Sequence, residues 1–202
     1  EAKPYIPNRA NEGHGLNNHA INALESLGVS LLITVDCGSS SIGEIKYANS
    51  LGIDVIITDH HSLPHNLPPA LAIINHNRID SMYPFRELAG VGLAFKLAQA
   101  LYESIETKCP SDLLEFVALG TVADMVPLKG ENRTLVTLGI KALNSTQKPG
   151  LKAITQNSRI RTGMIDSEAI SFYLAPRLNA PGRLDDPMIS LELLTTISEH
   201  DA

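Results

Sequence analysis

Val29-Ser30-Leu31-Leu32-Ile33-Thr34-Val35 is a continuous, mostly apolar run, and Asp54-Val55-Ile56-Ile57-Thr58 repeats the pattern further along the chain. Such runs indicate strands that are buried on both faces, as in a parallel sheet. Residues 39–51, which lie between them, have a helical pattern that Gly52 ends. Strand, helix and strand with short links predict a right-handed parallel unit. A third apolar run at residues 71–74 extends the predicted sheet.

The pattern changes after residue 85, where strands give way to helices. Apolar periodicity and helix-breaking Pro and Gly residues delimit helical segments there at 88–105, 112–123, 133–144, 150–157, 167–174 and 188–197. One further helix is predicted before the first strand, at 19–27. Residues 158–165 fit either a short strand or a turn. We therefore predict an α/β fold, a parallel sheet with flanking helices followed by a mostly helical half. We place the α/β core at residues 1–85 and its helical continuation, which leads to further domains, at residues 86–202.

Composition narrows the class of protein and its compartment. The 202 residues are 44% hydrophobic and 19% charged, which argues against a disordered chain or a fibre. No apolar run is long enough to span a bilayer, so no membrane contact is expected. Cys37 and Cys109 form no Cys-x-x-Cys pair, which favours a reducing cytoplasm. The net charge of −6 argues against a nucleic-acid partner unless several carboxylates hold divalent cations.

Acidic and histidine residues follow directly after the two strongest strands. Asp36 comes after the first strand, and Asp59, His60 and His61 come after the second. Parallel strands end at the same edge of a sheet and lie ~4.8 Å apart, so these side chains can reach one ion. Carboxylate with imidazole suits Mn²⁺, Zn²⁺ or Fe²⁺ better than Ca²⁺. Two structural alternatives stay open, namely Asp36 as the cap of the next helix and the histidines bonded to loop backbone.

Asp124 is a third candidate ligand. It ends the apolar segment 119–123, where the negative end of a helix dipole disfavours a carboxylate unless a cation compensates it. An exposed aspartate in the turn before Pro127 is the alternative, and spacing does not choose between the two.

Three segments resemble, in order, the second, third and fourth motifs of the DHH phosphoesterase family. They are Val35-Asp36-Cys37-Gly38, Thr58-Asp59-His60-His61 and residues 120–128, Gly-Thr-Val-Ala-Asp-Met-Val-Pro-Leu. The connecting segments are similar to the RecJ branch of that family. These are residues 6–9, 12–17, 88–92, 131–133 and 174–184, the last reading Leu-Ala-Pro-Arg-Leu-Asn-Ala-Pro-Gly-Arg-Leu. The resemblance extends over nearly the whole chain.

This resemblance implies a metal-dependent 5′-to-3′ exonuclease of single-stranded DNA, active in DNA repair and recombination, with two Mn²⁺ (or Mg²⁺) ions. It implies that Asp36 bridges both metals and that His60 and Asp124 bind one of them. Asp59 and His61 are the implied catalytic residues: His61 would touch the scissile phosphate or a water, and Asp59 would orient a histidine. Helicases and single-strand-binding proteins are the protein partners that the resemblance suggests.

Four further residues are candidates for contact with phosphate or DNA. Arg183 follows a Pro-Gly turn that would bring its guanidinium close to a backbone phosphate, and Asn179 would hold that loop. Arg177 is another candidate, with an ion pair to the segment Asp185-Asp186 as its structural alternative. By resemblance alone, Arg9 is a candidate for binding the terminal 5′-phosphate.

Two smaller features have competing interpretations. Gly90 and Gly92, at the start of a long helix, either leave backbone N–H groups free for an anion or permit close packing on the sheet. Cys37 lies beside Asp36, but nothing near it in sequence lowers its pKa, so we interpret it as a small buried residue rather than a nucleophile.

The first motif of the family, an Asp-x-Asp, would precede Tyr5, and its C-terminal nucleic-acid-binding parts would follow Ala202. We therefore expect the 202-residue chain to be nearly inactive as a nuclease by itself. Two alternative functions remain, a DHH phosphodiesterase of short oligonucleotides or cyclic dinucleotides, and a non-catalytic nucleic-acid-binding relative. A dinucleotide-binding domain is not favoured, because no Gly-x-Gly-x-x-Gly follows a predicted strand.

Overall fold

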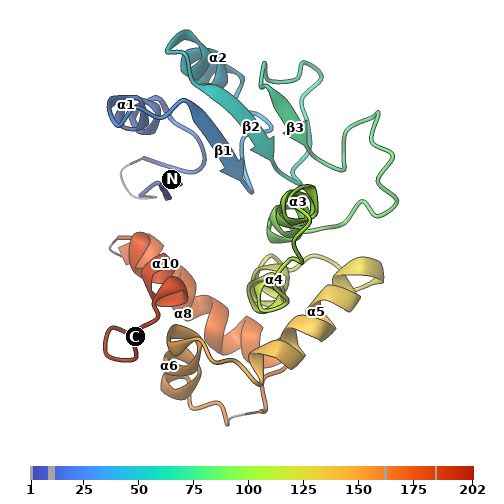
Figure 1. The fold of residues 1–202 in the computed structure, drawn as a ribbon, viewed down its shortest axis with the longest axis vertical. Coiled ribbons are helices and arrows are strands. Elements are labelled where there is room, and N and C mark those ends of the chain that lie inside the picture. The colour runs from blue at the N-terminus through green and yellow to red at the C-terminus, as the bar shows by residue number, and fades with distance from the viewer. Residues whose placement is uncertain (1, 9–11, 162, 185) are drawn as a thin grey trace.

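The chain begins with a parallel sheet whose three strands end at the same edge. A computed structural model describes residues 2–8, 12–161, 163–184 and 186–202. Strands β1 (Leu31–Val35), β2 (Asp54–Thr58) and β3 (Ala72–Ile74) lie in the order β1-β2-β3 and are all parallel. Val35 pairs with Thr58, and Thr58 with Ile74, so the carboxyl ends of the strands are level. Their arrowheads point towards the helical half of the molecule (Figure 1).

Two helices cover one face of this sheet. Helix α1 (Asn18–Ser26) begins at Asn17, whose side chain accepts a hydrogen bond from the backbone N–H of Ala20, a normal N-cap. Helix α2 (Ile42–Ser50) connects β1 to β2. The core between these helices and the sheet consists of Ile21, Ile45, Ala48, Ile53, Val55 and Ile57, which are all nearly inaccessible to solvent. The predicted parallel unit is therefore confirmed.

The second half of the chain is a layer of helices around α4 (Figure 1). Its main elements are α3 (Gly90–Ser104), α4 (Leu113–Ala123), α5 (Gly130–Leu143), α6 (Pro149–Asn157) and α10 (Met188–Thr195). Helix α4 is apolar on all sides, as expected of a helix that neighbours enclose. Val117 faces the core beneath α3, whereas Ala118, Leu119 and Val122 belong to the core beneath α5, α6 and the C-terminal helices. The predicted fold class is confirmed.

The segment from Ser167 to Leu184 differs from expectation. The predicted helix at 167–174 begins as α7 (Ser167–Ala169), becomes π-helical as η1 (Ile170–Leu174), and continues as α8 (Ala175–Asn179). The expected Pro-Gly turn is wrong, because Pro181–Leu184 forms a short helix, α9. Proline suits a first helical position, where its missing N–H costs nothing and its φ is already helical. The described residues of 158–165 form turns and no strand.

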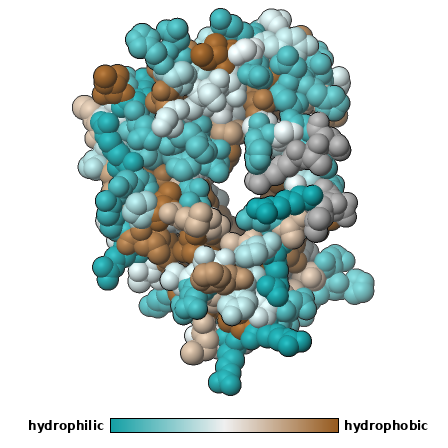
Figure 2. All heavy atoms as spheres, turned by 180° about the vertical axis from the view of Figure 1, so that it is seen from behind, coloured by the Kyte–Doolittle hydropathy of each residue, from teal (hydrophilic) through white to brown (hydrophobic). Residues whose placement is uncertain are grey.

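The molecule is hollowed between the sheet half and the helical half (Figure 2). The carboxyl ends of the strands point towards α3, which contacts β1 and β2 (Figure 1). The predicted boundary at residue 85 falls in the segment that connects β3 to α3. Among the described residues, no helix has the length and apolar character needed to cross a membrane.

Candidate metal centre

Asp36 occupies the carboxyl end of β1 in an unusual backbone conformation. Its φ is +61°, a left-handed value that aspartate tolerates better than most residues. Its N–H still donates to the carbonyl of Thr58, at 2.9 Å, so the sheet ladder fixes the backbone while the side chain turns away from the strand. Asp36 does not cap the following helix, because α2 begins at Ile42 with Ser41 as its N-cap.

His60 lies between two carboxylates. Its Nε2 is 3.1 Å from Oδ1 of Asp36 and 3.5 Å from Oδ2 of Asp124, which is the C-cap residue of α4. This nitrogen is buried, yet it forms no hydrogen bond with either oxygen. An imidazole nitrogen that lies between two carboxylates suits a transition-metal cation such as Mn²⁺, which takes nitrogen and oxygen ligands together.

The charge balance of this cluster also fits a cation. Asp36 and Asp124 form no ion pair with any described lysine or arginine. The neighbouring Asp36 carboxylate, more than Asp124, raises the pKa of His60 above its usual value, although burial opposes this. Burial raises the pKa of Asp124, which the nearby His60 partly offsets. The two carboxylates therefore favour a positive charge at His60, and a metal ion can supply that charge in place of a proton.

Asp59 and His61 form a second, adjoining pair. Asp59 is buried, and its two oxygens accept hydrogen bonds from the backbone N–H groups of Ser39 (2.9 Å), His60 (2.8 Å) and His61 (3.2 Å). Oδ1 also lies 2.7 Å from Nδ1 of His61. Burial acts to raise the pKa of Asp59, but the hydrogen bonds from Ser39 and His61 outweigh it, so the pKa is lowered. Asp59 is therefore an ionised carboxylate that fixes the ring of His61.

His61 stands at the edge of the metal cluster. Asp36, His60 and His61 each offer one ligand atom, and these atoms lie within 4.8 Å of one another. Because Nδ1 of His61 is held by Asp59, its Nε2 is the nitrogen left for a metal, a water or a substrate. Unlike His60, the side chain of His61 is largely exposed, so a substrate can reach it.

Gly90 and Cys37 complete the surroundings of Asp36. A Cβ at Gly90 would lie 2.6 Å from both Cβ and Cγ of Asp36, so the first turn of α3 packs directly on this side chain. Close packing rather than anion binding explains this glycine. Burial, followed by the charges of Asp59 and Asp36, raises the pKa of Cys37 to about 11. The thiol is therefore a poor nucleophile, as expected from the sequence.

A groove of about 490 Å³ begins beside Asp124. Ala123 and Met125, on either side of Asp124 in sequence, line it together with Asn179 and Arg183. Arg183 is exposed and forms no ion pair with any residue that the structure describes. Two of the predicted phosphate-binding residues therefore share a groove next to the metal cluster.

The remaining phosphate candidates lie elsewhere. The guanidinium of Arg177 donates a hydrogen bond to the carbonyl of Tyr173 (2.8 Å) and lines a different hollow, so it is not brought together with Arg183. It makes no ion pair with Asp186, whose Oδ1 instead accepts from the N–H of Met188. Asp185, the other alternative partner, lies outside the described residues. Arg9 lies outside the described residues.

Asn75, which sequence reasoning missed, holds the Asp59–His61 loop in place. Its amide donates to Oγ of Ser39 (3.0 Å) and to the carbonyl of His61 (2.9 Å). Asn75 directly follows β3. The signal was available, since the rule that polar residues at strand ends form the site applies equally to the third strand.

Comparison with known proteins assigns the chain to a class. Residues 1–121 match the DHH family, N-terminal domain. Because this match covers more than half of the chain, the chain belongs to the DHH family.

Its relatives within that family are exonucleases. The chain is 47% identical, over 98% of its length, to the single-stranded-DNA-specific exonuclease RecJ of Bacillus subtilis (strain 168), and 40% identical, over 94%, to that of Escherichia coli (strain K12). It spans 25% and 35% of the length of these two relatives.

Two solved structures have the same fold. A crystal structure of exonuclease RecJ bound to manganese matches 99% of this chain at a TM-score of 0.89 and 32% identity, with 50% of that chain covered. RecJ from Thermus thermophilus in complex with Mn²⁺ matches 92% of this chain at a TM-score of 0.80 and 29% identity, with 28% of that chain covered. The resemblance to the RecJ branch of the DHH family is thus confirmed.

Proposed function

We propose that this chain is the metal-binding part of a 5′-to-3′ exonuclease that hydrolyses single-stranded DNA in repair and recombination. One observation carries the proposal: Nε2 of His60 lies unpartnered between the carboxylates of Asp36 and Asp124. The identity to RecJ proteins, which are named for this activity, supports it.

Asp36, His60 and Asp124 would hold Mn²⁺ (or Mg²⁺), and the bound cation would stabilise negative charge on the phosphodiester and activate a water. His61 would act on the substrate itself. With its Nδ1–H donated to Asp59, its Nε2 can accept a proton from a water or, when protonated, donate one to a phosphate oxygen. Asp59 would fix the tautomer and stabilise the imidazolium.

We infer that the whole protein supplies further parts of the site. Strands in parallel sheets are normally covered on both faces. Leu31, Ile33 and Val35 nevertheless point to one face of β1 and are about half exposed in this chain. Since the chain spans only 25% of its relative from Bacillus subtilis, segments outside it would cover this face and complete a two-metal site.

Arg183 would bind a phosphate of the strand in the groove beside Asp124. It forms no ion pair with Asp186, and Asp185, the other structural alternative for Arg183, lies outside the described residues. Asn179, which also lines the groove, would contact the same strand. A strand with a free end must be supplied by unwinding, so we include helicases and single-strand-binding proteins among the partners. We place the activity in the cytoplasm, where these partners act on DNA.

The test is digestion of a long 5′-phosphorylated single strand by the full-length protein with Mn²⁺. We expect mononucleotides from the 5′ end. Asp36→Asn should abolish the activity together with Mn²⁺ binding, whereas His61→Gln should lower kcat by about 10²–10⁴-fold and leave KM nearly unchanged. Asp54→Asn is the matched control, because Asp54 lies on β2 at the opposite edge of the sheet. Cleavage of dinucleotides or cyclic dinucleotides, with long strands left intact, would contradict the proposal.

A further inference from the structure

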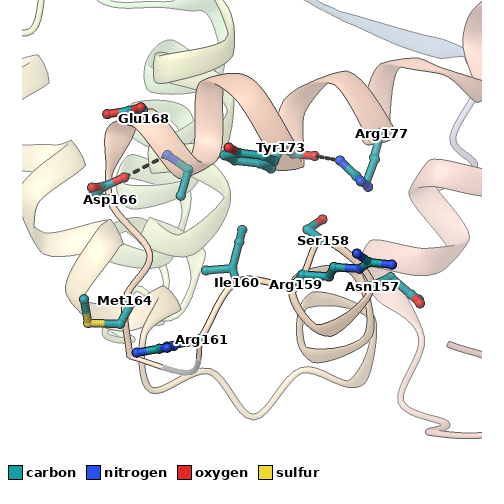
Figure 3. Close-up of a pocket in the computed structure, with 11 residues that line it drawn as sticks. Asn157, Ser158, Arg159, Ile160, Arg161, Met164, Asp166, Glu168, Tyr173 and Arg177 are labelled. Carbon is teal, nitrogen blue, oxygen red and sulfur yellow. Dashed lines mark hydrogen bonds between the residues drawn. The ribbon is translucent and has the colours of Figure 1, made fainter.

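A second hollow, of about 760 Å³, is bordered by the η1–α8 segment (Figure 3). Tyr173 and Arg177 line this hollow, whereas Ser171, Ala175 and Asn179 line the groove. Residues two positions apart on a helix point in nearly opposite directions, so one helix separates the two spaces. The opposite wall of the hollow is the end of α6 and the turn that follows it.

Two arginines share one end of this hollow without an acidic partner. Arg159 and Arg177 both line it and extend towards the same end in Figure 3. Neither forms an ion pair with a described residue, and the guanidinium of Arg177 donates only to the carbonyl of Tyr173 among the described residues. The acidic residues of the hollow, Asp166 and Glu168, lie at its other end (Figure 3), where Asp166 accepts from the N–H of Ala169. Like charges gathered in this way favour an anion between them.

Ser158 adds a donor at the same place. The residue is 7% exposed, and its Oγ has no hydrogen-bond partner, which is unfavourable for a hydroxyl. Its side chain points up into the hollow, between the two arginines in the view of Figure 3. Arg159 is exposed, so its side chain can turn aside and admit an anion to this hydroxyl.

The backbone of Arg159 is also unusual. Its φ is +57°, directly after the C-cap residue of α6. Helices most often place Gly, and sometimes Asn, at this left-handed position. The conformation at the end of α6 therefore does not explain why this residue is an arginine, and a role of the Arg159 side chain would explain it.

We infer that Arg159, Arg177 and Ser158 form a binding site for a phosphate group. Guanidinium groups can bind phosphate oxygens in pairs, and the hydroxyl would supply a further donor. The half-exposed ring of Tyr173 beside them suits stacking with a nucleotide base. This assignment rests on the proposed function: the site would bind a backbone phosphate of the DNA strand. It lies on the far side of the helix that borders the metal centre. It would hold the strand without taking part in cleavage.

The test measures binding of a fluorescein-labelled oligothymidylate to the full-length protein carrying Asp36→Asn, so that no strand is cut. Arg159→Asn removes the charge while placing at φ +57° a residue that tolerates it, so the fold should be preserved. We expect this variant and Arg177→Gln each to weaken binding about 3- to 10-fold and to lower the logarithmic salt slope by about 0.7. Ser158→Ala should weaken binding without lowering Tm, because it removes an unpartnered buried hydroxyl.

Arg161→Gln is the matched control, since Arg161 lines the same hollow at the end away from Ser158 (Figure 3). An equal effect of Arg161→Gln, or unchanged binding in both Arg159→Asn and Arg177→Gln, would overturn the site. A second arm adds inorganic phosphate and follows Tm. A rise in Tm that Arg159→Asn abolishes, with oligothymidylate binding unaffected, supports a site for free phosphate and overturns the strand assignment. Failure of the parent Asp36→Asn protein to bind any single strand would instead count against the proposed function.

Discussion

The position of the Asp36 carboxylate depends on Gly90, which packs against it, as much as on the end of β1. The left-handed backbone of Asp36 turns its carboxylate towards His60, and the first turn of α3 packs against the same side chain. A ligand must be held within a fraction of an ångström to bind well. The glycine therefore matters for metal binding although it offers no ligand atom.

Gly90→Ala should disturb the metal centre. The new methyl group would lie 2.6 Å from Cγ of Asp36, which is too close for two carbon atoms, so the carboxylate must move. We expect Mn²⁺ affinity, measured by calorimetry, to fall by about 10- to 100-fold, the usual effect of losing a ligand's support. Gly92→Ala is the control, because its methyl group would contact Leu88, at 3.2 Å from Cδ2 and 3.4 Å from Cβ, and not Asp36. Equal Mn²⁺ affinities in the two variants would contradict this role of Gly90.

At the scale of elements, β1 and β2 have similar sequences but different surroundings. Both strands are apolar and lie side by side in register. Ile57 is fully buried beneath α1 and α2, whereas Ile33 is 44% exposed on the other face. The helices that cover the sheet, rather than strand propensity, decide how much each isoleucine contributes.

The same substitution should therefore have different effects in the two strands. In the 202-residue chain, we expect Ile57→Thr to lower the free energy of unfolding by about 2–4 kcal/mol, because it leaves a void and buries a hydroxyl. Ile33→Thr should change it by less than about 0.5 kcal/mol, since threonine is also a good strand former. Urea denaturation of both variants measures this. A loss at Ile33 as large as that at Ile57 would mean that this face is covered within the chain itself.

At the scale of the whole molecule, the described residues gather ligands around one point. Asp36, His60 and His61 offer ligand atoms within 4.8 Å of one another, and Oδ2 of Asp124 lies 3.5 Å from Nε2 of His60. A two-metal site holds ions roughly 3.5–4 Å apart and needs carboxylates for both. We propose that the further carboxylates come from outside this chain, which spans only 25% of its relative from Bacillus subtilis.

We therefore expect the purified 202-residue chain to bind about one Mn²⁺ in a calorimetric titration and to be nearly inactive on single-stranded DNA. The full-length protein should bind two ions and degrade the strand. Robust Mn²⁺-dependent digestion by the short chain would contradict the expectation. Asp36→Asn serves as the control for bound metal, since it should remove the single ion without unfolding a chain in which this side chain is about half exposed.

The sequence by itself determined the parallel sheet and the positions of Asp36, Asp59, His60 and His61 at one edge of it. Strand periodicity is a local property, and parallel strands necessarily end together, so no distant contact was needed for this inference. Asn75 was equally predictable from the same rule.

Only the tertiary structure decided how the distant residues meet this edge. Asp124, the C-cap residue of α4, reaches His60 because α4 packs against α3 and α5, and helix packing, rather than local sequence, sets the position of its carboxyl end. Arg177 and Arg183 were both candidates for phosphate binding, yet they line different hollows on the two sides of the segment that η1 and α8 form. We predicted a turn at residues 181–184, but these residues form the short helix α9. A turn and a helix direct their side chains differently, so the direction of Arg183 could not be predicted from the local sequence. For these residues the physical cause is long-range packing, which no local pattern records.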